Sequence, residues 1–120
     1  MIGLVLTGLI ALSLIGIGCF ALVSPRASAG QYGIVVADPR ALAYLRAMGV
    51  RDLVIGVLLL LLVGAGQTEL LAVGVAASSA IAMLDAIVVA RDGGKGRVLA
   101  LHVGGAAGLL FTAVVLVLGA

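Results

Sequence analysis

The chain has 120 residues, of which 64% are hydrophobic and 10% are charged, with a formal net charge of +2. Soluble domains carry about 25% charged residues, so this composition excludes a soluble globular domain and indicates a membrane protein with room for about four spans of ~20 residues. The small net charge argues against nucleic acid as a partner. The single cysteine, Cys19, excludes an intramolecular disulfide and any site that needs several cysteines.

The first apolar run, residues 1–23, is expected to be a retained membrane span. The tripeptide Ala27-Ser28-Ala29 has the form of a signal-peptide cleavage site, but no Lys or Arg precedes the run. The run is also longer than the apolar region of a secretory signal, which has about 7–15 residues. Residues 24–30 contain Ser, Pro and Gly and should end the helix, and residues 31–36 should form an interfacial loop or a re-entrant stretch.

The second span is expected over residues 42–65, but its start is open. Asp38-Pro39 indicates the beginning of a helix, with Asp38 as the N-cap and Pro39 at the first helical position.

Two arrangements of this second segment are possible, because the apolar stretch 53–65 is too short to cross a bilayer by itself. A longer helix carries Arg46, Arg51 and Asp52 into the membrane, where Arg46 can reach the interface with its long side chain. Alternatively, residues 38–50 form a surface helix, and Arg51 and Asp52 lie at the membrane boundary.

The third and fourth spans are expected over residues 70–90 and 98–120. A tight turn, residues 64–69, precedes the third span, and a polar glycine-rich loop, residues 91–97, joins it to the fourth. We therefore expect an all-α membrane protein in which residues 1–120 form one domain, a bundle of four antiparallel transmembrane helices.

The basic residues of the connecting segments give the expected orientation. They fall in the first and third connections and comprise Arg26, Arg40, Arg91, Lys95 and Arg97. The positive-inside rule then places these two connections in the cytoplasm and both termini outside a multi-pass cell-membrane protein.

Asp85 and His102 are the most informative polar residues of the spans. Asp85 is the only charged residue within residues 70–90, and His102 lies five residues into the fourth expected span. Both sit roughly 8–9 Å from the basic end of their spans, and antiparallel neighbours would bring them together. A carboxylate beside an imidazole can transfer protons. The alternative is a polar clamp between two helices, worth about 0.6–2 kcal/mol.

Arg51 and Asp52 are expected to point in different directions, because neighbouring residues on a helix diverge by ~100°. Asp52 shares a helix face with Gly49 and Gly56, where small residues allow another helix to approach, and this favours an inward-facing Asp52. Arg51 could then pair with Asp85. The alternative is an ion pair that only fixes the packing of the second and third spans.

The remaining candidates concern substrate contacts and self-association. Arg51 or Arg46 is expected to balance the carboxylate charge and, with Ser78, to contact the substrate. Ser78 could instead bond its own backbone, as serine in helices often does. Gly104 and Gly108 form a G-x-x-x-G pattern, which predicts a packing face within the bundle or between copies of a homo-oligomer.

From Pro25 to its end, the chain resembles the small integral-membrane family catalogued as domain of unknown function 4267. The resemblance rests on these segments, among which the R-x-x-G-x-R-D block and the late aspartate and histidine are the most specific: Ser24-Pro25-Arg26-Ala27, Ala37-Asp38-Pro39, residues 44–53, Leu84-Asp85-Ala86, Arg91-Asp92-Gly93-Gly94 and Leu101-His102-Val103-Gly104-Gly105. The chain is also similar, more distantly, to DoxX-like four-helix membrane proteins. The resemblance implies a four-span bundle and transfers no activity.

The residues favour an acid–base enzyme that acts on a lipophilic small molecule by isomerisation, epoxide opening or cyclisation. Asp52, Asp85 and His102 are the expected catalytic residues, in a pocket that opens toward the cytoplasmic half. We expect no cofactor and no metal, because one histidine cannot supply bis-histidine ligation of haem. Three alternatives remain open: a small transporter, a quinone- or lipid-binding accessory subunit of a membrane complex, and a purely structural subunit. Membrane lipids are the other expected partner.

Overall fold

The structure is a computed structural model that describes residues 1–33 and 35–119. Within this part of the chain it is all-helical, with α1 (Ile2–Val23), α2 (Pro25–Gln31), α3 (Ala41–Gly64), α4 (Thr68–Arg91) and α5 (Arg97–Val117). Ile34, in the expected interfacial stretch, and Ala120, in the expected fourth span, lie outside the described residues.

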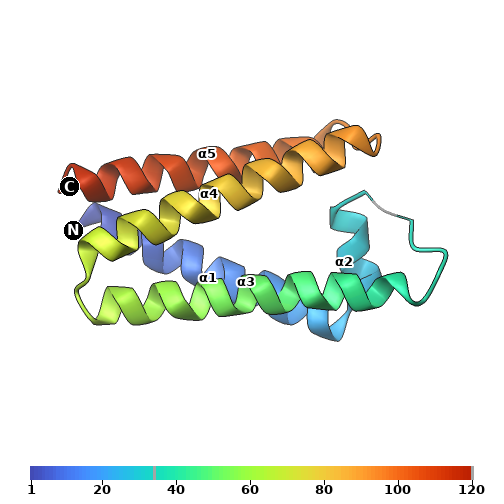
Figure 1. The fold of residues 1–120 in the computed structure, drawn as a ribbon, viewed down its shortest axis with the longest axis horizontal. Helices are drawn as coiled ribbons and strands as arrows, with labels where there is room; N and C mark the ends of the chain where they lie inside the picture. Colours follow the sequence, from blue (N-terminus) through green and yellow to red (C-terminus); the bar gives the residue numbers. More distant parts are fainter. Residues whose placement is uncertain (34, 120) are drawn as a thin grey trace.

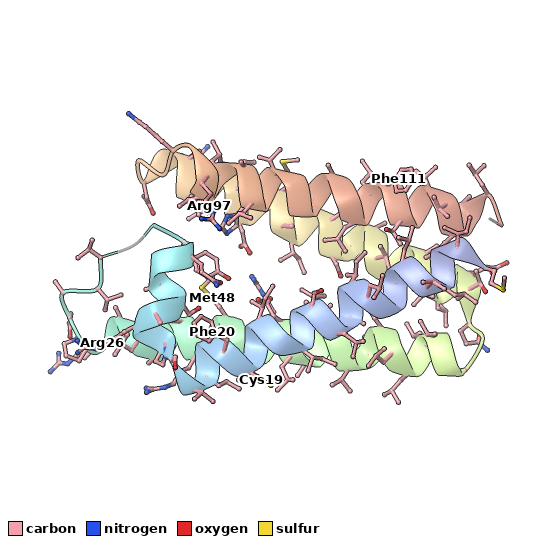
Figure 2. All side chains as sticks on the ribbon, turned by 180° about the vertical axis from the view of Figure 1, so that it is seen from behind. Cys19, Phe20, Arg26, Met48, Arg97 and Phe111 are labelled. Atoms are coloured by element: carbon pink, nitrogen blue, oxygen red, sulfur yellow. The ribbon has the colours of Figure 1, made fainter. Side chains whose placement is uncertain are left out.

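The four long helices have the length and composition of membrane spans. They contain 22, 24, 24 and 21 residues, and each is apolar enough to cross a bilayer. Large apolar side chains are exposed on the long helices, among them Leu61, Val73 and Phe111, whose exposed fractions are 66%, 67% and 62%. Figure 2 shows Phe111 on the outside of α5. Such an outer surface suits lipid rather than water. The expected all-α bundle of four transmembrane helices is therefore confirmed.

The bundle consists of two antiparallel helix pairs, α1 with α3 and α4 with α5 (Figure 1). The pairs lie close together at the end that holds both termini, and they diverge toward the opposite end, where α2 stands between them. The contacts within each pair are far more extensive than those between the pairs. The two pairs therefore diverge on the α2 side of the bundle.

Small residues hold α1 and α3 close together. A Cβ atom added at Gly18 would lie 2.5 Å from the carbonyl oxygen of Gly49, and one added at Gly49 would lie 2.7 Å from the Cβ of Ala21. About two helical turns further along α3, a Cβ added at Gly56 would lie 2.7 Å from the carbonyl oxygen of Ala11. Close backbone approach through small residues is a common basis of helix association in membranes.

The apolar core lies in the half of the bundle near the termini. Its buried residues come from all four long helices and are Ala11, Leu59, Leu71, Ala72, Val75, Leu109, Ala113 and Leu116. A smaller cluster at the other end joins Ala29 of α2 to Leu42 and Leu45 of α3. This second cluster fixes α2 across the open side of the bundle (Figure 1).

Residues 41–64 form one continuous helix, so residues 38–50 do not form a separate surface helix. The helix begins at Ala41 rather than at Pro39, because the preceding residues form a turn in which Asp38 Oδ1 accepts a hydrogen bond from the Arg40 N–H at 2.9 Å. Helix α2 was not expected from the sequence. It begins at Pro25, a residue whose fixed φ suits the first position of a helix.

Candidate functional site

A cavity of about 720 Å³ lies between the two helix pairs and ends against α2. All four long helices contribute large apolar residues to its wall, namely Leu14, Ile17, Ile55, Ile81, Leu101 and Leu109. The polar residues of the wall come mostly from the α2 side and are Gln31, Tyr32, Arg51, Asp52, Ser78, Asp85, Arg97 and His102. The three expected catalytic residues, Asp52, Asp85 and His102, thus line one cavity.

Arg51 joins α3 to α4 by a forked ion pair. Its Nη2 donates to Asp85 Oδ2 at 2.9 Å, its Nη1 donates to Asp85 Oδ1 at 3.4 Å, and its Nε donates to Asp52 Oδ1 at 3.1 Å. The expected pairing of Arg51 with Asp85 is confirmed. The expectation that Arg51 and Asp52 point apart was wrong, because the long arginine side chain bends back to its neighbour although the two Cα–Cβ bonds diverge.

The inward orientation expected for Asp52 is confirmed. Its side chain is only 10% exposed, compared with 24% for Asp85 and 34% for Arg51. Gly49 and Gly56 lie on the same face of α3 and contact α1, so Asp52 is held at the interior of the bundle. Two carboxylates share one guanidinium here, which leaves this cluster with one excess negative charge when both are ionised.

His102 does not pair with Asp85 within the described residues, so the expected direct contact was wrong. Asp85 is bound by Arg51, and His102 instead places Nδ1 at 2.9 Å from the carbonyl oxygen of Val98. Because a carbonyl oxygen only accepts hydrogen bonds, we assign the proton of the neutral ring to Nδ1. The Nε2 atom then carries a lone pair and has no hydrogen-bond partner among residues 1–33 and 35–119.

Tyr32 connects α2 to this site. Its ring lies 5.0 Å from the ring of His102, with an angle of 54° between the ring planes. Burial raises the pKa of the Tyr32 phenol above its ordinary value of 10.0, the charges of Asp52 and Asp85 raise it further, and Arg51 opposes them. The phenol therefore stays protonated at neutral pH and can donate a hydrogen bond.

Sequence reasoning missed Tyr32, Gln31 and Arg97 as lining residues. Gln31 is the last residue of the unexpected helix α2 and Tyr32 follows it directly. Arg97 was interpreted only as a topology signal. Figure 2 shows Arg97 at the end of α5 that lies beside α2. The scarcity of aromatic residues, with 2 Tyr and 2 Phe in the chain, was the one signal that could have drawn notice to Tyr32.

Arg46 and the glycine pair take no part in the cavity. Of the two arginines that could balance the carboxylates, Arg51 does so, whereas Arg46 is exposed and does not line the wall. A substrate contact of Arg46 stays a prediction. Gly104 and Gly108 are exposed, and a Cβ at either would meet nothing within 4 Å. They therefore do not form a packing face within the bundle, and a contact between copies stays a prediction.

Ser78 fits both of its interpretations, because it lines the cavity and donates to the carbonyl oxygen of Gly74 in its own helix at 2.8 Å. A second serine of α4, Ser79, donates across to the carbonyl oxygen of Ala106 in α5, also at 2.8 Å. Among the residues that the structure describes, the cavity wall included, no three His, Cys, Asp or Glu side chains lie close enough together to hold a metal ion.

The family model described as Domain of unknown function (DUF4267) matches residues 11–116. The chain belongs to this family. The matched range includes every polar residue of the cavity wall, so the whole polar part of the site lies within the region that the family shares. A search of the curated proteins and of the solved structures found no match. The resemblance to this family is confirmed, whereas the more distant similarity to DoxX-like proteins stays a prediction.

Proposed function

We propose that this protein is a membrane enzyme that binds a lipophilic small molecule in the cavity and acts on it by acid–base chemistry. The observation that carries the proposal is the distribution of polarity in the wall. The volume of about 720 Å³ lies within the range of small-molecule sites, roughly 300–1,000 Å³. The wall is apolar toward the bundle core, and its ionisable groups gather toward α2, including an imidazole nitrogen with a free lone pair.

His102 is the group best placed to move protons. Its Nδ1–H bond to the Val98 carbonyl holds the ring in one tautomer and orientation, so Nε2 can take a proton from the substrate. The imidazolium that forms can return this proton at another atom, which balances an isomerisation without a further reagent. Tyr32 can polarise a substrate oxygen through its protonated phenol.

This assignment changes the roles expected for the two aspartates. Both carboxylates interact with Arg51, so they are poorly suited to donate a proton to the substrate. In our proposal, Asp52 and Asp85 provide the electrostatic environment of the cavity and tie α3 to α4.

A second candidate function is non-catalytic binding, as in a small carrier or a quinone- or lipid-binding accessory subunit. The forked ion pair of Arg51 favours it, because a cross-link between α3 and α4 alone explains the presence of these three charges in the bundle. This candidate requires the same cavity but no proton transfer, so the two functions differ in the fate of the bound molecule.

Two glycines of α5 provide a matched test of the cavity. Gly105 lines the cavity and Gly104 does not, and a Cβ at either meets nothing within 4 Å. Leucine at position 105 should therefore fill part of the cavity, and leucine at position 104 should project from the outer face. We expect mass spectrometry of solvent extracts to find a defined lipophilic compound with wild type and with Gly104→Leu, and to find it depleted with Gly105→Leu. Identical bulk lipid in all three extracts would count against the proposal.

Proton transfer is tested with His102→Asn, which keeps a side-chain N–H for the Val98 carbonyl and removes Nε2. The extracted compound is incubated in D₂O with wild type or with the variant. We expect wild type to incorporate deuterium into the compound, or to convert it to an isomer, and we expect His102→Asn to bind it unchanged. Binding without exchange or conversion by either protein would select the carrier or accessory-subunit function.

We also propose the orientation expected from the basic residues, with both termini outside. Both termini lie at one end of the bundle, and the first and third connections lie at the other (Figure 1). All basic residues of the connections are therefore on one side, as the positive-inside rule requires.

A further inference from the structure

The three ion-paired side chains in the wall of the cavity do not balance one another. Arg51 is the only cation that pairs with Asp52 and Asp85 in the described chain, so the cluster carries one excess negative charge when both carboxylates are ionised. An uncompensated charge is costly in a bilayer, and intramembrane charges usually pair with one another or mark a ligand or ion pathway. The excess charge therefore suggests a further positive partner.

Asp52 provides the place for such a partner. Its side chain is nine-tenths buried, and Oδ1 accepts the hydrogen bond from Arg51 Nε. The structure gives Oδ2 no hydrogen-bond partner among the described residues, although Asp52 lines the cavity. Asp85 differs, because both of its oxygens accept hydrogen bonds from Arg51. A ligand in the cavity can thus satisfy an oxygen that the protein leaves unpaired.

The other charged and titratable groups of the wall do not remove the excess. Arg97 forms no ion pair in the described chain, but it is exposed at the first residue of α5, where water and salt screen its charge. His102 is bound to the Val98 carbonyl oxygen and forms no ion pair with either aspartate in the described chain. Burial is the main cause of the raised pKa of the Tyr32 phenol, and the charges of Asp52 and Asp85, which together outweigh that of Arg51, raise this pKa further.

We infer that the ligand of the cavity is a lipophilic amine, bound as its cation with the ammonium group on Asp52 Oδ2 and its apolar body along the inner wall. This inference rests on the proposed function, because it names the chemical class of the molecule that the cavity binds. The ring of Tyr32 lies in the same wall and offers an aromatic surface to such a cation.

Three probes with the same twelve-carbon chain test the inference: dodecylamine, dodecanol and dodecanoate. Binding is measured by isothermal titration calorimetry at neutral pH, with the full chain in phosphatidylcholine nanodiscs and empty nanodiscs subtracted. We expect wild type to bind dodecylamine at least tenfold more tightly than dodecanol, which corresponds to about 1.4 kcal/mol. Dodecanoate should bind most weakly.

Two neutralising variants should abolish this preference, since each removes the excess charge. Asp52→Asn removes the proposed ammonium partner itself, and Asp85→Asn leaves Arg51 balanced by Asp52 alone. Asp92→Asn is the matched control, because Asp92 is an exposed carboxylate outside the cavity wall and its loss should leave the preference intact. Using two variants keeps the test decisive if one of them does not fold.

The possible results separate this inference from the proposed function. Equal binding of the amine and the alcohol would overturn the inference and would indicate that a proton neutralises the cluster, while the cavity remains a lipophilic site. Preference for dodecanoate would also overturn it and would assign the headgroup to Arg97. Binding of none of the three probes would count against the cavity as a ligand site, and hence against the proposed function.

Discussion

Replacing Arg51 with glutamine should destabilise the bundle more than any other single charge removal in the chain. Glutamine keeps a polar side chain of similar length but carries no charge, so Asp52 and Asp85 lose their shared cation. The helices α3 and α4 would lose a charged cross-link between the two helix pairs, whose mutual contacts are sparse.

The magnitude follows from the burial of the three groups. Removing one partner of a fully buried ion pair costs roughly 3–5 kcal/mol. Arg51 and Asp85 are 34% and 24% exposed, so water screens part of this loss, whereas Asp52 is 10% exposed and keeps most of it. We therefore expect the free energy of unfolding to fall by about 2–3 kcal/mol.

The free energy of unfolding is measured by reversible unfolding in mixed detergent micelles, with circular dichroism as the probe of helix content. Arg46→Gln is the matched control, because Arg46 is exposed on the same helix and makes no ion pair in the described chain. Adding Asp85→Asn to the Arg51→Gln variant should recover part of the loss, since it removes one unpaired carboxylate. If Arg51→Gln and Arg46→Gln destabilise the protein equally, the ion pair does not hold the bundle together and the reasoning fails.

Three further predictions concern helix packing, pH and topology. Gly49→Leu should lower the free energy of unfolding by at least about 1–3 kcal/mol, the usual cost of overpacking a core, because even its Cβ would meet the Cβ of Ala21 at 2.7 Å. The control variant Gly104→Leu should unfold like wild type when unfolding is monitored by circular dichroism. Equal stability of the two variants would refute the close approach of α1 and α3. In a Tyr44→Phe background, the remaining phenol, Tyr32, should ionise above pH 10.0 in an ultraviolet titration. Because the pKa of Tyr32 is higher in the folded chain than in the unfolded chain, its contribution to stability is present below pH 10 and is lost as the pH rises above that value. A midpoint at or below 10 would show that neither burial nor the carboxylates raise the pKa of Tyr32. A cysteine at Lys95 should react with an impermeant thiol reagent only after the cells are opened, and labelling of intact cells would reverse the proposed orientation.

The four spans could be predicted from the sequence because long apolar runs of this composition have no other stable arrangement. The inward orientation of Asp52 followed from Gly49 and Gly56 on the same helix face, which is a local property of one helix. The Arg51–Asp85 pair could also be anticipated, since two opposite charges inside a bilayer gain by meeting.

The rest of the site depends on how separate segments pack, which the helix pattern does not contain. Helix α2 has seven residues, too few for a periodicity to be recognised, and Tyr32 reaches the cavity only because Ala29 packs against α3. His102 was expected to meet Asp85 because both lie at a similar depth. The competition of Arg51 for that carboxylate could be resolved only from the positions of all three side chains.

The most direct test of the central claim is to titrate the compound extracted from the wild-type protein back into ligand-free wild type, Gly105→Leu and Gly104→Leu. If the cavity between the helix pairs is the binding site, wild type and Gly104→Leu should bind with the same Kd, and Gly105→Leu should bind at least tenfold more weakly, which corresponds to about 1.4 kcal/mol. Equal affinity of all three proteins would contradict the account, because the compound would then bind outside the cavity.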